Sequence, residues 1–339
     1  MCKNFNALDL MKFILSLFII AIHFPPLDSY SSLGSFLFTE GLSRIAVPLF
    51  FITSGFFFAY KDINNNKSIY IYIRNLIKLY IFWSIIYLPY SIYDWVINDK
   101  NLLLDILIYI KNFLFVGSFI QLWFFIALAL GIILLIILLK KFSINKILFL
   151  SFILYLIGVF GDSYYGFLNH IPSIKRIYDT YLFIFETTKN GVFFGFFFVT
   201  LGYYINIKDI KSTKTIAITG SLLSLILILV EALFIKFLDY ALDFNMYFSL
   251  IPASFFIFIL IKEIKLPNNP IYPTLRKSSV LIFEIHPLIS ALIFVLAYIL
   301  GSEMILNNSL LHYLSITILS IISSFTYLYL KKRSTTNST

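Results

Sequence analysis

Apolar stretches of roughly twenty residues recur along the whole 339-residue chain, and this recurrence constrains the fold more than any other feature. Hydrophobic residues make up 60% of the sequence, whereas charged residues make up only 13%. About 20 consecutive apolar residues form a helix long enough to cross the hydrocarbon core of a membrane. The sequence therefore predicts an all-α, polytopic integral membrane protein.

We expect about ten transmembrane helices, of which the fifth is the shortest. No stretch between them is long enough for a soluble domain. We therefore predict a single ten-helix membrane domain over residues 1–333 and a disordered cytoplasmic tail over residues 334–339. The predicted spans are residues 8–26, 43–60, 75–95, 120–139, 147–161, 182–205, 215–236, 246–262, 278–299 and 309–330.

The basic residues predict the orientation of these helices. The net charge is +9, and most of the 26 basic residues fall in alternate loops, such as the one that holds Arg74 and Lys78. Loops enriched in lysine and arginine stay on the cytoplasmic side. Both termini are therefore predicted to be cytoplasmic, and the charge excess reports topology rather than nucleic-acid binding.

The stretch 102–119 has the length of a span but carries a polar stripe. Asp105, Tyr109 and Asn112 recur at positions i, i+4 and i+7. An additional span here would invert every later loop and destroy the alternation of charge. We predict an amphipathic helix that lies in the outer membrane interface.

Two polar residues inside the first predicted span stand out, namely Lys12 and His23. A charged residue or an imidazole is costly within a bilayer and is a functional-site hypothesis by default. Eleven residues of helix rise about 16 Å, which puts Lys12 near the cytoplasmic face and His23 near the outer face. In the alternative reading, Lys12 extends its ammonium group to the nearby interface and His23 is simply solvated.

The second span runs inward, so Arg44 is predicted at its outer end, close to His23. Ser54 and Gly55 lie deeper, and Pro48 is predicted to break the hydrogen-bond ladder of this helix beside a cavity. The alternatives are that Arg44 is an interface anchor and that Ser54 and Gly55 form a packing notch between helices.

Further polar residues mark the outer ends of other spans. Glu186, Lys189 and Asn190 cluster before the sixth apolar run, where they form either a polar vestibule near His23 or a solvated helix end. Trp123 begins the fourth span, a place where tryptophan commonly anchors a helix in the interface.

The ninth and seventh spans contain ionisable residues as well. Glu284 and His286 are two residues apart and therefore point to different faces of their helix, so one of them is expected to face the interior of the bundle. Glu231, inside the seventh span, must be paired or protonated. The histidine and carboxylate spacing fits no metal site, and the single cysteine, Cys2, excludes a disulfide framework.

Several of these pieces together resemble the acyltransferase 3 family of bacterial integral-membrane proteins. The resemblance covers nearly the whole chain and has the same order of motifs. The matching pieces are LDLMKFI at residues 8–14, a basic residue separated from His23 by ten residues, R-x-A-V-P-x-F-F-x-x-S-G-F at Arg44–Phe56, L-W-F at 122–124 and I-H-P at 285–287.

The resemblance implies a ten-helix enzyme of the bacterial cytoplasmic membrane. Such an enzyme moves an acyl group, usually acetyl, from cytoplasmic acyl-CoA to a hydroxyl of an extracytoplasmic glycan or envelope acceptor, without a metal. It also implies roles for individual residues: His23, Arg44 and Ser54 as catalytic; Lys12, Arg74 and Lys78 as ligands of the coenzyme phosphates; and Glu186, Asn190, Trp123 and His286 as acceptor-binding.

One position departs from the pattern of the family, which more often has arginine where this chain has Lys12. Lysine keeps the charge but lacks the planar fork that binds a phosphate or a carboxylate through two parallel hydrogen bonds. The mode of donor recognition is therefore expected to differ from that of family members with arginine.

The runs at residues 190–205 and 44–57 also resemble the membrane half of vancomycin-resistance serine racemases. That similarity keeps a second class of function open, a carrier for a small polar solute such as serine. In a carrier, Lys12, Arg44, Glu186, Glu284 and His286 would line the path. The sequence shows no convincing internal repeat, which disfavours the carrier folds that are built from inverted repeats.

Overall fold

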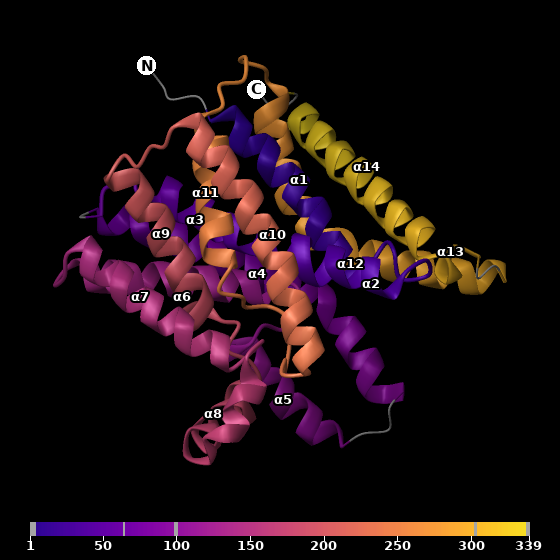
Figure 1. Ribbon diagram of the computed structural model, residues 1–339. Helices are drawn as coiled ribbons and strands as arrows, with labels where there is room; N and C mark the ends of the chain where they lie inside the picture. The colour runs from indigo at the N-terminus through magenta and orange to yellow at the C-terminus, as the bar shows by residue number, and fades with distance from the viewer. Residues whose placement is uncertain (1–4, 64, 98–100, 302–303, 337–339) are drawn as a thin grey trace. The chain divides into compact units, whose positions relative to one another are not determined.

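A computed structural model describes residues 5–63, 65–97, 101–301 and 304–336 (Figure 1). These residues form helices and turns and contain no strand, so the all-α prediction is confirmed. The chain divides into two compact units. Unit 1 comprises residues 1–50, 211–233 and 249–339, and unit 2 comprises residues 51–210 and 234–248.

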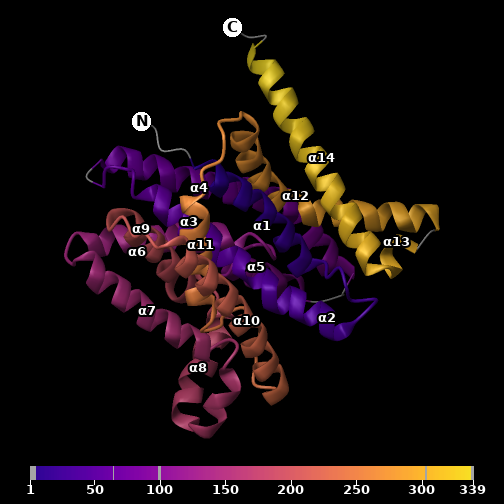
Figure 2. The ribbon, with the colours of Figure 1, turned by 45° about the horizontal axis from the view of Figure 1, so that its top comes forward.

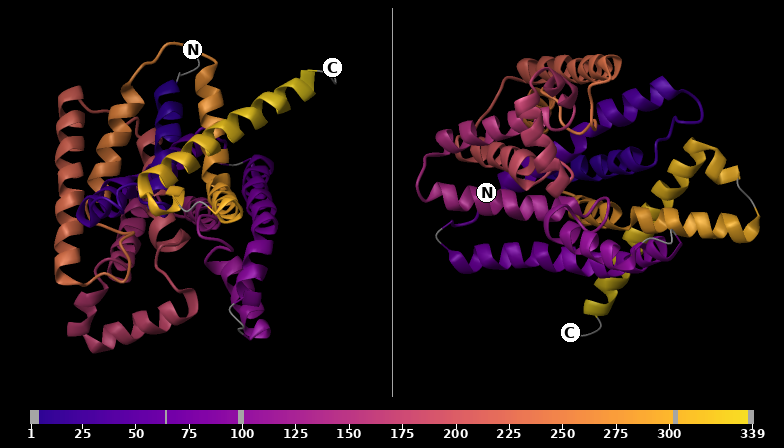
Figure 3. Two further views of the ribbon diagram at one scale, coloured as in Figure 1. Left: turned by 90° about the vertical axis from the view of Figure 1, so that its right-hand side faces the viewer. Right: turned by 90° about the horizontal axis from the view of Figure 1, so that it is seen from below.

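Unit 1 is built around α1 (Asn6–His23), which packs against α12 (Ile271–Leu300) and α14 (Ser309–Thr336). Figure 3 shows α1 between α12 and α11 (Leu250–Glu263). The short α13 (Met304–Asn307) leads from α12 into α14 (Figure 2). Buried isoleucines join the three long helices, and the members of this core are Ile20, Ile282, Ile293 and Ile316.

The predicted second span, residues 43–60, begins within an irregular helical stretch. There α2 (Ser32–Phe36) is followed by a π-helical turn (η1, Leu37–Gly41), a 3₁₀ turn (η2, Leu42–Ile45) and α3 (Ala46–Phe58). The predicted break at Pro48 is wrong. Pro48 is the third residue of α3, and a proline is tolerated there because the first N–H groups of a helix have no partner within it. The irregular backbone precedes the proline instead.

Unit 1 also contains most of α10 (Lys214–Leu238). Glu231 on this helix was predicted to be paired or protonated. Its Oε2 accepts a hydrogen bond from the backbone N–H of Ser249 at 2.8 Å, one residue before α11 begins. The half-buried carboxylate thus ties the start of α11 to α10.

Unit 2 has a core of α6 (Trp123–Leu139), α7 (Ile144–Phe160) and α9 (Phe196–Ile207), which lie side by side (Figure 1). The long α4 (Asn66–Ile97) packs against α6. At the centre, the ring of Tyr155 contacts those of Phe194 and Phe198, and its hydroxyl donates to the carbonyl of Tyr247 at 2.6 Å.

Two short helices of unit 2, α5 (Leu102–Phe115) and α8 (Pro172–Phe185), have 14 residues each. The helix predicted at 102–119 is therefore confirmed as an element, with Asn101 as its N-cap. The 3₁₀ turn η3 (Tyr165–His170) precedes α8, and the π-helical turn η4 (Gly191–Gly195) lies between α8 and α9. The predicted sixth span, 182–205, is wrong at its start, because α8 ends at Phe185 and the helical backbone resumes at Gly191.

The described residues contain six helical segments that are long and apolar enough to cross a membrane. Three shorter apolar segments of 17 residues, at Trp123–Leu139, Ile144–Phe160 and Gly191–Ile207, accompany them. Of the predicted tail, residues 334–336 continue α14, and residues 337–339 lie outside the described residues.

Candidate functional site

Two imidazole rings meet in unit 1. His23, the last residue of α1, stacks on His286 of α12 with the ring centroids 5.3 Å apart and the planes 23° from parallel. His286 is completely buried, whereas His23 is half-buried. The prediction that one of Glu284 and His286 faces the interior understates the packing, since both side chains are buried.

The surroundings of His286 determine its protonation pattern. Its Nδ1 lies 3.2 Å from the backbone carbonyl oxygen of Ile282, one turn earlier in α12. A carbonyl oxygen can only accept a hydrogen bond, so Nδ1 carries the hydrogen and Nε2 of the neutral ring carries a lone pair. Among the described residues, nothing donates a hydrogen bond to that buried Nε2.

A third histidine, His312 of α14, lies on the other side of Phe24. The ring of Phe24 makes edge contacts with His286 at 6.1 Å and with His312 at 5.5 Å. Nε2 of His312 lies 3.4 Å from Oγ of Ser290. In the sequence His312 is an ordinary helix-end histidine, because it has no distinctive spacing to the other two.

The loop after His23 is tied to the start of α14 by serine hydroxyl groups. The backbone N–H of Ser29 donates to Oγ of Ser309 at 3.0 Å, and the N–H of Ser309 donates to Oγ of Ser29 at 3.1 Å. Oγ of Ser309 also donates to the carbonyl of Pro26 at 2.9 Å. These bonds hold the backbone that follows the His23 ring.

An ionic group lies near the other end of α1. The carboxylate of Asp9, which is buried, lies 3.5 Å from a guanidinium nitrogen of Arg276, and Lys12 interacts electrostatically with both residues. Lys12 is therefore one of two cations beside a single carboxylate. Sequence reasoning did not identify Asp9 and Arg276 as its neighbours, although Asp9 is one helical turn before Lys12.

Arg44 forms an ion pair with Glu40, four residues earlier. Its Nε donates to Oε2 of Glu40 at 2.8 Å, and a terminal nitrogen donates to the same oxygen. This partner was missed, although i,i+4 spacing of a glutamate and an arginine is a readable signal.

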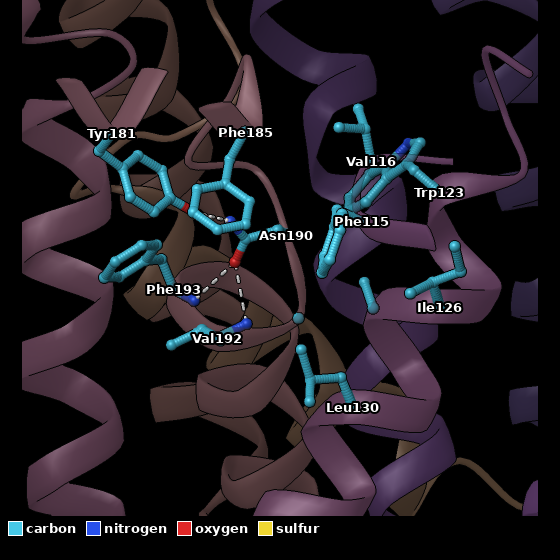
Figure 4. A pocket seen from close by; sticks show the side chains of 12 residues that line it. Phe115, Val116, Trp123, Ile126, Leu130, Tyr181, Phe185, Asn190, Val192 and Phe193 are labelled. Carbon is cyan, nitrogen blue, oxygen red and sulfur yellow. Dashed lines mark hydrogen bonds between the residues drawn. The ribbon is translucent and has the colours of Figure 1, made fainter. Parts of the chain in front are cut away.

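In unit 2, Trp123 and Asn190 line one cavity of about 200 Å³ (Figure 4). The Oδ1 of Asn190 accepts from the backbone N–H groups of Val192 and Phe193, which caps η4. Its Nδ2 donates to the hydroxyl of Tyr181 at 2.6 Å. Burial raises the pKa of that Tyr181 hydroxyl, so the hydroxyl remains protonated.

Lys189 is held beside this cavity by a buried polar chain. Its Nζ lies 5.3 Å from the centroid of the Trp123 ring and donates to Oδ1 of Asn245 at 3.0 Å. The amide nitrogen of Asn245 donates in turn to Oδ2 of Asp162. Burial, followed by the nearby carboxylate of Asp243, raises the pKa of Asp162 to about 6.

Glu186, predicted to line a vestibule, pairs instead with α5. Its Oε1 accepts from Nζ of Lys111 at 2.5 Å, and its Oε2 accepts from Nδ2 of Asn112 at 3.4 Å. Its φ of 61° lies in the left-handed region, which is uncommon for a residue other than glycine. This backbone conformation ends α8.

The remaining predicted residues also belong to unit 2. Arg74 and Lys78 are exposed on α4, and the Arg74 guanidinium lies 5.7 Å from the centroid of the Tyr70 ring. Ser54 is half-buried on α3. Its neighbour Gly55 has no room for a side chain, because a Cβ there would overlap the backbone of Val199 on α9.

Long apolar helices define an α-helical membrane protein, and two of its imidazole rings stack at the end of one of these helices. The sequence matches the acyltransferase 3 family, described as an acyltransferase domain, over residues 5–329. The chain therefore belongs to this family. Family membership supports a membrane acyltransferase in general.

Named relatives at this level of similarity are racemases of enterococci. An amino-acid racemase of Enterococcus faecalis is 29% identical over 322 residues, which cover 94% of this chain and 44% of the relative. A serine/alanine racemase of Enterococcus gallinarum is 30% identical over 336 residues, which cover 98% of this chain and 46% of the relative. The chain thus spans less than half the length of these relatives. No solved structure matches it.

Proposed function

We propose that this protein is a membrane O-acyltransferase that moves an acyl group, usually acetyl, from cytoplasmic acyl-CoA to a hydroxyl of an extracytoplasmic glycan or envelope acceptor. The observation that carries the proposal is the half-buried imidazole of His23, stacked at 5.3 Å on the buried His286. A partly accessible imidazole held by a rigid neighbour is suited to proton transfer near neutral pH.

In the proposed reaction, His23 removes the proton of the acceptor hydroxyl as its oxygen attacks the thioester carbonyl. A C–O bond forms, the tetrahedral intermediate collapses and the C–S bond breaks. The proton then passes from the His23 imidazolium to the coenzyme thiolate, which leaves as the free thiol. Arg44 and Ser54 are proposed to stabilise the oxyanion that develops on the carbonyl oxygen.

The donor is proposed to bind through its phosphates. Lys12 and Arg276 both lie near the carboxylate of Asp9, close to the start of α1. Two cations at this place fit a phosphate group. Arg74 and Lys78, both exposed on α4, are proposed to contribute on the same side of the membrane.

The proposed topology follows the charges of the loops. Ten helices would cross the bacterial cytoplasmic membrane with both termini in the cytoplasm, and the shorter apolar segments would span together with the six long ones. The donor cluster and His23 would then lie about 16 Å apart along α1. Either the pantetheine arm reaches inward or the acyl group is relayed through His23.

His286 is proposed to orient the base from its place against the His23 ring. Trp123, Asn190 and Glu186 belong to unit 2, and no part in acceptor binding is proposed for them. Membrane lipids surround the protein in this proposal.

The test is incorporation of radiolabelled acetyl from acetyl-CoA into the cell envelope of cells that express the protein. Wild type is compared with His23→Ala and with a matched control, His170→Ala, whose imidazole lies in unit 2 beside Tyr240. Label is expected in wild type and in the control. Its loss in His23→Ala, at equal membrane content of protein, supports the assignment, and full activity in that variant contradicts it.

The named relatives favour a second candidate function, the transport of a small polar solute such as serine. In that case no acetyl label would appear in any strain. Uptake of labelled serine by the same strains distinguishes the two candidates.

A further inference from the structure

The cavity of unit 2 has walls that suit a hydrocarbon chain. Four elements form it, namely the end of α5, the first turns of α6, the end of α8 and η4 (Figure 4). Three lining side chains carry a polar group, the amide of Asn190, the hydroxyl of Tyr181 and the indole N–H of Trp123, and the other lining side chains are apolar. The lining side chains include Phe115, Val116, Trp123, Ile126, Tyr181 and Phe185.

The hydrogen bonds of Asn190 account for its whole amide. Its Oδ1 accepts two backbone N–H groups, and its Nδ2 donates to the hydroxyl of Tyr181 and to the carbonyl of Thr187. An amide offers two donors and two acceptor sites, so this one has none left for a ligand. The Tyr181 hydroxyl and the Trp123 indole N–H remain as donors, which is too few for a sugar with several hydroxyl groups, whereas an alkyl chain would gain from leaving water.

The volume of the cavity agrees with a segment of such a chain. An apolar cavity of about 150 Å³ is large enough to bind benzene. The cavity of about 200 Å³ therefore has room for a short stretch of hydrocarbon.

The cavity lies between two helices that present apolar side chains outward. Leu103 on α5 is 67% exposed, and Phe183 on α8 is 87% exposed. A helix of 14 residues is about 21 Å long, which is too short to cross a hydrocarbon core of about 30 Å. Short helices with an exposed apolar face lie in the membrane interface, so the occupant of the cavity has access from the lipid.

The ends of the two helices are joined at the cavity. The rings of Phe115 and Phe185 meet edge to face at 5.7 Å, and Lys111 pairs with Glu186. Glu186 holds this position with a positive φ, which costs energy for a non-glycine residue. These contacts hold the ends of α5 and α8 together and so fix the wall of the cavity.

A cation stands next to the apolar lining. The Nζ of Lys189 lies over the ring of Trp123 and is oriented by Asn245, which is itself oriented by Asp162. An ammonium group beside a hydrocarbon slot matches an anionic head group joined to an acyl chain. Asp162 is buried and reaches Lys189 through Asn245.

We propose that this cavity binds an acyl chain of an anionic glycerophospholipid, with Lys189 beside the phosphate. The site lies wholly within unit 2 and does not depend on the proposed acyl transfer. Lipid bound here would fasten α5 and α8 to the membrane surface.

The experiment uses Trp123 as the reporter. The chain has three tryptophans, so Trp83→Phe and Trp95→Phe together leave Trp123 as the only one. The full-length protein is placed in phosphatidylcholine nanodiscs with increasing fractions of phosphatidylglycerol that is brominated on its acyl chains. A parallel series contains brominated phosphatidylcholine instead, because bromine quenches tryptophan fluorescence on contact.

We expect saturable quenching of Trp123 by the phosphatidylglycerol series and weaker quenching by the phosphatidylcholine series. Lys189→Gln should raise the fraction of phosphatidylglycerol that gives half-maximal quenching by about fivefold, the factor expected for the loss of one cation near a membrane surface. Lys189→Arg should return this fraction to the wild-type value. Val116→Phe, which fills the cavity, should abolish saturation. Leu103→Phe, on the exposed face of α5, serves as its control.

Two results would overturn the proposal. The first is equal quenching by the two lipids, and the second is quenching that Val116→Phe leaves unchanged. The unfolding temperature of each variant is measured in the same nanodiscs. If Val116→Phe fails to fold, Lys189→Gln against Lys189→Arg decides the outcome alone.

Discussion

The imidazole of His23 stacks on that of His286, although the two residues come from opposite ends of the chain. The first ring is half-buried at the end of α1, and the second is buried on α12 with its Nδ1 bonded to the carbonyl of Ile282. One ring is therefore accessible for chemistry, while the other has a fixed orientation and a fixed tautomer.

His286→Phe and His286→Ala test whether the stacked ring of His286 is enough to support His23 without its nitrogen atoms. Phenylalanine keeps a ring beneath His23, so it should retain the unfolding temperature to within a few degrees and keep part of the transfer activity. Alanine leaves a cavity in the core and should cost about 3 kcal/mol. Thermal unfolding in detergent and acetyl incorporation measure both effects. An alanine variant as stable as wild type would show that the stack does not support the fold.

Arg44→Ala should cause a large loss of acetyl transfer, and Arg44→Lys should restore it only partly. The reason is that Nε and a terminal nitrogen of Arg44 both donate to Glu40, a geometry that lysine cannot reproduce. Transfer rates at equal protein content are the measurement. If Arg44→Lys were as active as wild type, position 44 would require only a positive charge and not the guanidinium geometry.

The stability of unit 2 should depend on the ionisation of Asp162. The pKa of this carboxyl is raised to about 6 in the folded chain, chiefly by burial, above its ordinary value of about 3.9. The resulting stabilisation is complete below about pH 4 and is lost as the pH rises through about 6, and it amounts to about 3 kcal/mol.

Unfolding temperatures between pH 4.5 and 8 check this dependence. Asp162→Asn should remove most of the slope and also lower stability, because its amide nitrogen would face the amide nitrogen of Asn245. The exposed Asp28 offers the control Asp28→Asn, which should keep the slope. A slope unchanged by Asp162→Asn would assign the pH dependence to another group.

Gly55→Ala should lower the yield of folded protein. A Cβ at this position would overlap the backbone of Val199, and α3 and α9 would have to separate at a cost of about 1–3 kcal/mol. Gly301→Asn is the control, because open space surrounds Gly301 and asparagine tolerates its positive φ of 61°. Size-exclusion profiles and unfolding temperatures of both variants provide the measurement. A Gly55→Ala protein that behaves like wild type would rule out this close approach.

Much of the fold could be predicted from local sequence, and the failures have local causes. Helices occur in all ten predicted spans, because runs of apolar residues without interruption form helices regardless of their neighbours. The sixth span began too early because Leu182–Phe185 is as apolar as a membrane segment, whereas its α8 is amphipathic as a whole. Pro48 was misread as a break because the start of α3 was unknown.

The site was predictable in part. Lys12 and His23 stand out in sequence because ionisable groups within an apolar helix are costly. Their neighbours did not stand out. Asp9 and Arg276 beside Lys12, and His312 beside Phe24, come from different helices or have no unusual spacing. Asn190 was predicted in a polar vestibule or a solvated helix end and Trp123 as an interface anchor, whereas both line a largely apolar cavity.

The sequence by itself determined that this chain is a bundle of membrane helices, because a backbone in lipid must satisfy its hydrogen bonds within each segment. It also determined that Lys12 and His23 lie about 16 Å apart along one helix, through the fixed rise per residue. Only the tertiary structure decided which side chains meet. Contacts such as His23 with His286, or Lys189 with Trp123, depend on how separate helices pack against one another, and no spacing along the chain encodes that.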